Sequence, residues 1–184
     1  WVGIMRLPGA SQMVVDGSGT NSTCYWVPRL DVPEPYTCDE DYFEYYRELL
    51  KDCVRRHSRS HVPVAYEVSG GLDSSAVFCM AEMLRRSKAL PAPAINGYTV
   101  SYADYTRADE VHYARAVGKH LGLEIREIAP SIRDPSWLRE QVRKYRDFPG
   151  FPASSVSSDL YSRAVEGGSR TVVTGLGGDH FLSG

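Results

Sequence analysis

Two glycine-rich stretches in this sequence each follow an apolar run, and each contains an aspartate. The first is VSGGLDSSAV at residues 68–77, with Asp73, and the second is VVTGLGGDHFLSG at residues 172–184, with Asp179. Paired glycines let the main chain approach a ligand closely, and the N–H groups at the start of a helix favour anions. Each stretch is therefore a candidate phosphate-binding loop.

The first stretch differs from two common phosphate loops. The pattern GxxxxGK[ST] needs a lysine that is absent here, and the dinucleotide pattern GxGxxG does not fit. A carboxylate such as Asp73 repels a phosphate unless a cation lies between them. A magnesium ion that bridges Asp73 and the phosphate oxygens is the economical explanation, and Asp179 would supply a second carboxylate. The alternative is a tight strand-to-helix turn in which Asp73 is a plain helix cap.

Strands and helices that alternate along the chain must position these loops. Apolar periodicity and turn residues predict strands at 62–68, 94–102, 123–129 and 170–175. The same signals predict helices at 39–56, 74–90, 107–122, 134–147 and 157–168. This alternation indicates an α/β fold, a parallel sheet with helices on both faces, in which ligands bind beyond the carboxyl ends of the strands. Both glycine stretches then lie at one edge of the sheet.

Some details of these elements are specific enough to test. Gly122 is predicted to cap one helix, and Asp134 with a following proline is predicted to start another. A hairpin is expected near the N-terminus, with a turn at residues 16–19 and a second strand at 24–27. The inner face of the helix at 74–90 is predicted to carry Ala76, Val77, Met80, Ala81 and Leu84.

Composition excludes several classes of function. The chain has 184 residues, of which 42% are hydrophobic and 24% charged, with a net charge of −2. These values favour a globular protein and give no cationic field for nucleic acid. No apolar run approaches the ~18 residues of a membrane span. The cysteines are too scattered for a zinc site and suggest reduced thiols in the cytoplasm.

Three blocks of sequence together resemble a known family. The stretch SGGLDSS is similar to the pyrophosphatase loop of N-type ATP pyrophosphatases, the PP-loop proteins with the adenine nucleotide alpha-hydrolase-like fold. With YTVSY…ADEVHYARAVGKHLG and VVTGLGGDHFLSG, it resembles the synthetase domain of class B, glutamine-hydrolysing asparagine synthetases. Their relatives include β-lactam synthetases and lasso-peptide macrolactam synthetases. The resemblance covers residues 37–184, and residues 1–36 resemble the tail of a glutaminase-like domain and its linker.

The resemblance implies a reaction and a site. A carboxylate such as aspartate attacks the α-phosphate of ATP, pyrophosphate leaves, and an amine from glutamine or ammonia displaces AMP to form an amide. It implies Mg²⁺ at Asp73 and Asp179. The residues implied to bind ATP and pyrophosphate are Val68, Ser69, Gly70, Gly71, Leu72, Asp73, Ser74, Ser75, Val100, Thr174 and Gly175.

The sequence departs from the family at two positions beside the second aspartate. Leu176 stands where asparagine synthetases carry glutamate and β-lactam relatives carry tyrosine, and leucine transfers no proton. His180 stands where the family has a second acid and is a candidate acid–base group, although such a histidine is more often packed or solvated. The alternatives are a macrolactam- or β-lactam-forming relative, a nucleotide-binding homologue without catalysis, and a thiolating enzyme, for which Cys79 is a poor nucleophile.

The ends of the chain indicate a fragment. The sequence begins at Trp1 and stops at Gly184, directly after a glycine-rich stretch. The family's glutaminase cysteine and C-terminal helical region, with its lysine, are not in this sequence. We therefore expect a synthetase domain truncated at its C-terminal side that binds nucleotide but is inactive alone.

Overall fold

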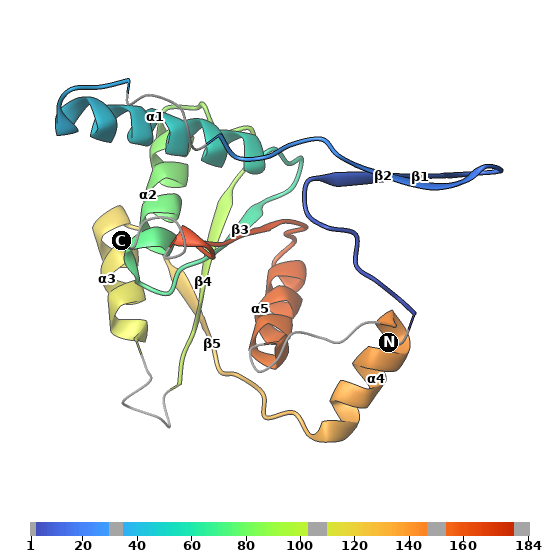
Figure 1. The fold of residues 1–184 in the computed structure, drawn as a ribbon. Coiled ribbons are helices and arrows are strands. Elements are labelled where there is room, and N and C mark those ends of the chain that lie inside the picture. Colours follow the sequence, from blue (N-terminus) through green and yellow to red (C-terminus); the bar gives the residue numbers. More distant parts are fainter. Residues whose placement is uncertain (1–2, 30–34, 103–109, 147–153, 179–184) are drawn as a thin grey trace. The chain divides into compact units, whose positions relative to one another are not determined.

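The computed structural model of the chain (Figure 1) describes residues 3–29, 35–102, 110–146 and 154–178. The chain divides into two compact units, Trp1–Tyr42 and Phe43–Gly184. Helix α1, Asp39–His57, begins in the first unit and continues in the second. Acidic residues open this helix and Arg55, Arg56 and His57 close it, as the helix dipole favours.

The first unit contains a β-hairpin. Strand β1, Ser11–Asp16, pairs antiparallel with β2, Gly19–Cys24. The predicted hairpin is present, but the expected second strand at 24–27 is wrong. Asp16 accepts hydrogen bonds from the N–H and hydroxyl of Ser18, which closes the turn within two residues and starts β2 at Gly19.

The second unit is built on a four-stranded parallel sheet, and the predicted α/β fold is confirmed. The sheet has the order β5-β4-β3-β6, in which every neighbouring pair is parallel. The strands are β3 at Val64–Glu67, β4 at Ile95–Val100, β5 at Ile125–Ile128 and β6 at Val172–Val173. Successive strands extend from β3 to β5 in one direction, and β6 then pairs with the other side of β3. The order in which strands are added to the sheet therefore reverses at the boundary between β3 and β6.

Helices cover both faces of the sheet, as predicted (Figure 1). On one face, Val64, Tyr66 and Val68 pack against α1, α2 and α3 in a single buried cluster with Phe78 and Ala114. On the other face, a second cluster joins the sheet to α5. Its buried members are Ala65, Tyr98, Ile128, Leu160 and Ala164. Because alternate strand residues point to opposite faces, β3 contributes to both clusters.

Helix α2, Leu72–Arg86, differs from the prediction at both ends. It starts earlier because Gly71 already serves as its N-cap. It ends before residue 90 because Lys88 has a φ of 59° and the N–H groups of Ala89 and Leu90 both donate to the carbonyl of Leu84. The predicted inner face is wrong at Ala76, which is exposed. The predicted Met80, Ala81 and Leu84 are buried, and the helix also buries Ser74, Phe78 and Glu82, which were not predicted.

The remaining helices follow the predicted signals closely. They are α3 at Val111–Leu121, α4 at Pro135–Tyr145 and α5 at Ser154–Glu166. Gly122 caps α3 with a φ of 70°, as its glycine predicted. Asp134 caps α4 by accepting from the N–H groups of Ser136 and Trp137, also as predicted. The part of the predicted third helix at residues 107–109 lies outside the described residues.

Candidate functional site: a glycine-lined pocket at the sheet edge

The candidate site lies where the chain changes direction in the sheet. The carboxyl ends of β3 and β6 are neighbours there, since Tyr66 pairs with Val173. Each strand then runs into one of the two glycine stretches found in the sequence. Ligands of open parallel sheets bind at such a switch point because diverging connections leave a crevice there.

The first loop depends on Gly70. This residue has a φ of +90°, and a β-carbon there would lie 2.3 Å from Cβ of Tyr113 and 2.7 Å from the amide nitrogen of Ala114. Any larger residue would therefore clash with the first turns of α3. Glycine is required at this position to bring the loop tight against a neighbouring helix.

The loop leads into a helix N-terminus that has no side-chain cap. Gly71 is the N-cap of α2, and none of the described side chains caps the first turn in its place. Leu72 and Asp73 thus belong to the helix, which was predicted to begin only at residue 74. The first-turn N–H groups of a helix have no partners within it, so they remain free to bind an anion.

Serine hydroxyls brace the same loop. Ser74 Oγ accepts from the main-chain N–H of Ser69 at 3.2 Å and lies 2.9 Å from Ser69 Oγ. Ser69 Oγ in turn accepts from the N–H of Gly71 at 3.3 Å. Two of the predicted ligand-binding hydroxyls therefore hold the loop in shape. Ser75 Oγ is buried and has no hydrogen-bond partner among the described residues.

The second loop packs directly on the first. A β-carbon on Gly175 would lie 2.5 Å from the amide nitrogen of Ser74, so these two main chains are in contact. A β-carbon on Gly178 would lie 2.2 Å from both Cγ and Oδ2 of Asp73. The Asp73 carboxylate therefore lies on the main chain of the residue that precedes Asp179.

The two loops line one pocket with a volume of about 440 Å³. Seven residues predicted from the sequence to lie at the site line it: Ser69, Gly71, Asp73, Ser74, Thr174, Gly175 and Leu176. Leu176 is 91% exposed, and its N–H donates to Thr174 Oγ1 at 3.3 Å. Asp179 and His180, the predicted second magnesium ligand and the candidate acid–base residue, lie outside the described residues.

Val68 and Val100, which the resemblance implies bind ATP, do not line this pocket. Val68 is fully buried in the cluster around α2, and its N–H donates to the carbonyl of Tyr98 at 2.8 Å. Val100, at the end of β4, packs against the cluster around α5. Because both side chains pack in the core, only the main chains of these two valines are available to a nucleotide, and that contact stays a prediction.

Three pocket residues were missed in the sequence: Glu67, Ser157 and Tyr161. Glu67 ends β3, and burial raises the pKa of its carboxyl above the ordinary value. A signal was present, because a charged residue inside the apolar strand sequence VPVAYEV is unusual. Ser157 and Tyr161 lie one turn apart on α5, and only the packing of that helix on the sheet brings them here.

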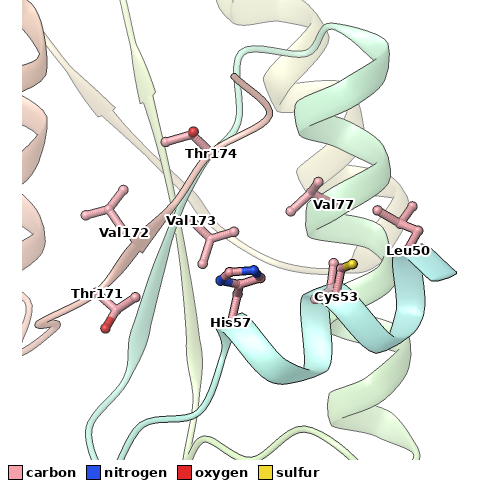
Figure 2. A pocket seen from close by; sticks show the side chains of 9 residues that line it. Leu50, Cys53, His57, Val77, Thr171, Val172, Val173 and Thr174 are labelled. Atoms are coloured by element: carbon pink, nitrogen blue, oxygen red, sulfur yellow. The ribbon is translucent and has the colours of Figure 1, made fainter. Parts of the chain in front are cut away.

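A second pocket lies on the other side of β6 and is chemically different (Figure 2). It has a volume of about 350 Å³, and it lies between residues of α1, Val77 of α2 and the segment Thr171–Thr174. In Figure 2, His57 and Val173 approach each other at its centre, with Cys53 beside them. Its walls are mostly apolar and hold no carboxylate among the described residues, so it lacks the chemistry of the first pocket.

The described residues include no cluster of three metal-ligating side chains. Asp73 is the one predicted metal ligand that the structure describes, and it lies beside the uncapped helix N-terminus. The main-chain contact between the loops leaves no room for side chains between them. The Asp73 carboxylate, the N–H groups at the start of α2 and the glycine main chain of the two loops together fit a phosphate chain that carries a magnesium ion.

The fold and the site define a class of protein: α/β domains with two glycine loops at the carboxyl edge of a parallel sheet. Residues 45–184 match the family described as asparagine synthase, and the chain belongs to this family. The family suspected from the three sequence blocks is thereby confirmed.

Individual relatives are distant. A putative asparagine synthetase [glutamine-hydrolyzing] 2 of Methanocaldococcus jannaschii is 30% identical, over 97% of this chain and 33% of its own length. Asparagine synthetase [glutamine-hydrolyzing] 2 of Bacillus subtilis is 29% identical, over 79% of this chain and 19% of its own length. The amidase chry2 of Gibberella zeae is 27% identical, over 87% and 25%. The chain spans a third or less of these relatives.

The cysteines limit the chemistry of the site. Cys24, Cys38, Cys53 and Cys79 are all free. Burial raises the pKa of the Cys79 thiol, which makes it a weaker nucleophile and argues against the thiolating alternative.

Among the described helices, none is both long and apolar enough to cross a membrane.

Proposed function

We propose that this chain is the ATP-binding synthetase part of an ATP-dependent amide-forming ligase. The observation that carries the proposal is the contact between Gly175 and the first turn of α2, which joins two glycine loops around an uncapped helix N-terminus. Family membership supports the same reaction class. The reaction would activate a carboxylate as an acyl-adenylate with loss of pyrophosphate, and an amine would then replace AMP.

The chain's residues would divide the work of holding ATP. The N–H groups at the start of α2 would bind the pyrophosphate portion, and they would stabilise the charge that builds on its oxygens as the bond to the α-phosphate breaks. Asp73 would hold a magnesium ion, with Asp179 as the second ligand. Bound magnesium would neutralise phosphate charge. The glycines would let the phosphates approach the main chain, because no side chain lies between the loops.

The names of the relatives and the position of Leu176 bear on the source of the amine. Two relatives carry the names of glutamine-hydrolysing asparagine synthetases, which supports glutamine or ammonia as the source of the amine. Leu176 supports the runner-up, a macrolactam- or β-lactam-forming relative, because an exposed apolar side chain in the pocket suits an amine on a larger organic group. Two other relatives are named amidases, so the named relatives do not all share one activity.

The products formed from ATP test the proposal. The complete protein, given Mg-ATP, ammonium and a carboxylate from a panel of the twenty amino acids, should release pyrophosphate and AMP. Chromatography of the nucleotides separates AMP from ADP. ADP as the main product would place the protein in another class of ligase. Binding of Mg-ATP without any turnover would favour the non-catalytic homologue.

A further inference from the structure

The pocket has a wall that the proposed ATP-binding residues do not explain. Glu67 from the end of β3 lines it together with Ser157 and Tyr161 from α5. Ser157 and Tyr161 are separated by one helical turn, so both lie on the same side of α5. This wall therefore carries one carboxylate and two hydroxyls.

The fold directs Glu67 toward this wall. Ala65, two residues earlier in β3, is buried in the cluster with α5, and alternation along a strand puts Glu67 on the same face. Glu67 pairs in register with Tyr98, another member of that cluster. The carboxylate thus projects to the α5 side of the sheet, at the open end beyond the apolar core.

The Glu67 carboxylate has no partner among the residues that the structure describes. Burial is the sole cause of its raised pKa, and no described residue donates a hydrogen bond to it or forms an ion pair with it. Asp73 lines the same pocket and adds further negative charge. A half-buried carboxylate without a partner costs free energy, and such groups in clefts are often parts of functional sites. A cationic ligand would offset this cost.

We propose that Glu67 binds the ammonium group of the amine substrate and accepts one proton from it before the amine attacks. This inference rests on the proposed function, which requires an amine that arrives protonated at neutral pH. Ser157 and Tyr161 would accept further hydrogen bonds from the same group. Leu176, apolar and exposed in the same pocket, would contact the carbon chain of a primary organic amine.

The step balances in atoms and electrons. The ammonium first gives one proton to the Glu67 carboxylate, which frees the nitrogen lone pair. The lone pair forms a C–N bond to the acyl carbon of the adenylate, and the bond from that carbon to the phosphate oxygen breaks. AMP leaves with the electron pair of the broken bond. The second proton lost from nitrogen passes to solvent as the amide forms.

Glu67→Gln separates this step from nucleotide binding, because it removes the charge and keeps the side-chain size. In the complete protein, ATP–pyrophosphate exchange and stabilisation by Mg-ATP should stay within about twofold of the unmodified protein. AMP release driven by ammonium, ethylamine or glycinamide should fall about 100-fold, the scale of lost general-base catalysis. Hydroxylamine is unprotonated at neutral pH, so it should still consume the adenylate. Glu67→Asp should retain part of the amine reaction.

Glu124→Gln is the matched control, because it makes the same chemical change at an exposed residue. Glu124 directly precedes the first residue of β5, at the opposite edge of the sheet from the pocket. It should match the unmodified protein in every assay. Three outcomes would overturn this inference and leave the proposed function standing. The first is amine-driven AMP release by Glu67→Gln equal to that of the unmodified protein, and the second is loss of pyrophosphate exchange in Glu67→Gln. The third is an unmodified protein that exchanges pyrophosphate but responds to none of the amines. Absence of exchange in the unmodified protein would overturn the proposed function, and this inference with it.

Discussion

The main chain of Gly175 lies directly against the amide nitrogen of Ser74, at the first turn of α2. A β-carbon on Gly175 would come within 2.5 Å of that nitrogen and 2.8 Å of the Ser74 α-carbon. Residues about a hundred positions apart in the sequence are thus joined without any intervening side chain. The shape of the pocket consequently depends on β6 as much as on the loop that follows β3.

Gly175→Ala should damage both stability and nucleotide binding. The added methyl group would force the two loops apart, and overpacking of this kind costs about 1–3 kcal/mol. Urea unfolding measures the lost stability, and a thermal shift with Mg-ATP measures the lost binding. Gly9→Ala is the control, because its added β-carbon would meet nothing within 4 Å. Equal stability and equal Mg-ATP shifts in both variants would show that the loops separate without cost.

Asp73→Ala should weaken Mg-ATP binding while the fold persists. The carboxylate lies in the first turn of α2 and lines the pocket, so its removal takes away a proposed magnesium ligand. A tenfold loss of affinity lowers the stabilisation by saturating Mg-ATP by about 1.4 kcal/mol. Thermal melting with and without Mg-ATP measures this difference.

Asp41→Ala provides the comparison for that variant. Asp41 is also an acidic residue in the first turn of a helix, α1, so both variants lose a similar interaction with a helix dipole, about 0.3–1 kcal/mol. Only Asp73→Ala should lower the Mg-ATP shift. The same shift in both variants would exclude Asp73 as a metal ligand.

The sequence predicts the order of elements well because the local signals agree with the packing. Strand β3 is apolar except for its last residue, Glu67, and the parallel sheet buries Val64, Ala65 and Tyr66 on both faces. Gly122 and Asp134 are local helix signals that work through their own main-chain neighbourhood. Ala76 was placed wrongly because small apolar residues fit either face of a helix, and Phe78 takes the buried position.

The sequence predicts the loops of the site but not its other wall. Glycine stretches carry a local main-chain pattern, so Gly70 and Gly175 could be identified without a structure. Ser157 and Tyr161 reach the pocket only because Leu160 and Ala164 pack α5 on the sheet. That long-range packing leaves no motif in the sequence.

Leu176→Glu should restore a proton-transferring group without harming the fold. Leu176 is 91% exposed, so the change should alter the free energy of unfolding by about 0.5 kcal/mol or less. The family resemblance implies that an acid at this position assists attack by ammonia. We expect the complete unmodified protein to make little asparagine from aspartate, ATP and ammonium, and the variant to make about tenfold more.

Mass spectrometry of the amide product checks that expectation. Ile132→Glu, which changes an equally exposed apolar residue outside the pocket, should leave product formation as it was. Efficient asparagine formation by the unmodified protein would contradict the prediction. The plain asparagine synthetase activity would then hold despite the leucine.

Glu67→Gln should stabilise the free protein at neutral and alkaline pH. Burial raises the pKa of Glu67 in the folded protein above its ordinary value of 4.5, so the folded state holds the proton more tightly than the unfolded chain. Stability from this group is fully present below pH 4.5 and is lost as the pH rises through the folded-state pKa. Asp73 and Tyr161 are the other titratable residues that line the pocket, and burial remains the sole cause of the raised pKa of Glu67. Glutamine carries no charge at any pH and escapes this loss.

Urea unfolding at a series of pH values measures this effect without any substrate. The stability difference between Glu67→Gln and the unmodified protein should be smallest near pH 4 and should grow in favour of the variant toward pH 8. Glu124→Gln should show no such trend, because Glu124 is exposed. Lower stability of Glu67→Gln at pH 8 would mean that the ionised carboxylate has a stabilising partner in the free protein. A carboxylate that lowers the stability of the free protein is what we expect of a group whose role is to bind a cationic ligand.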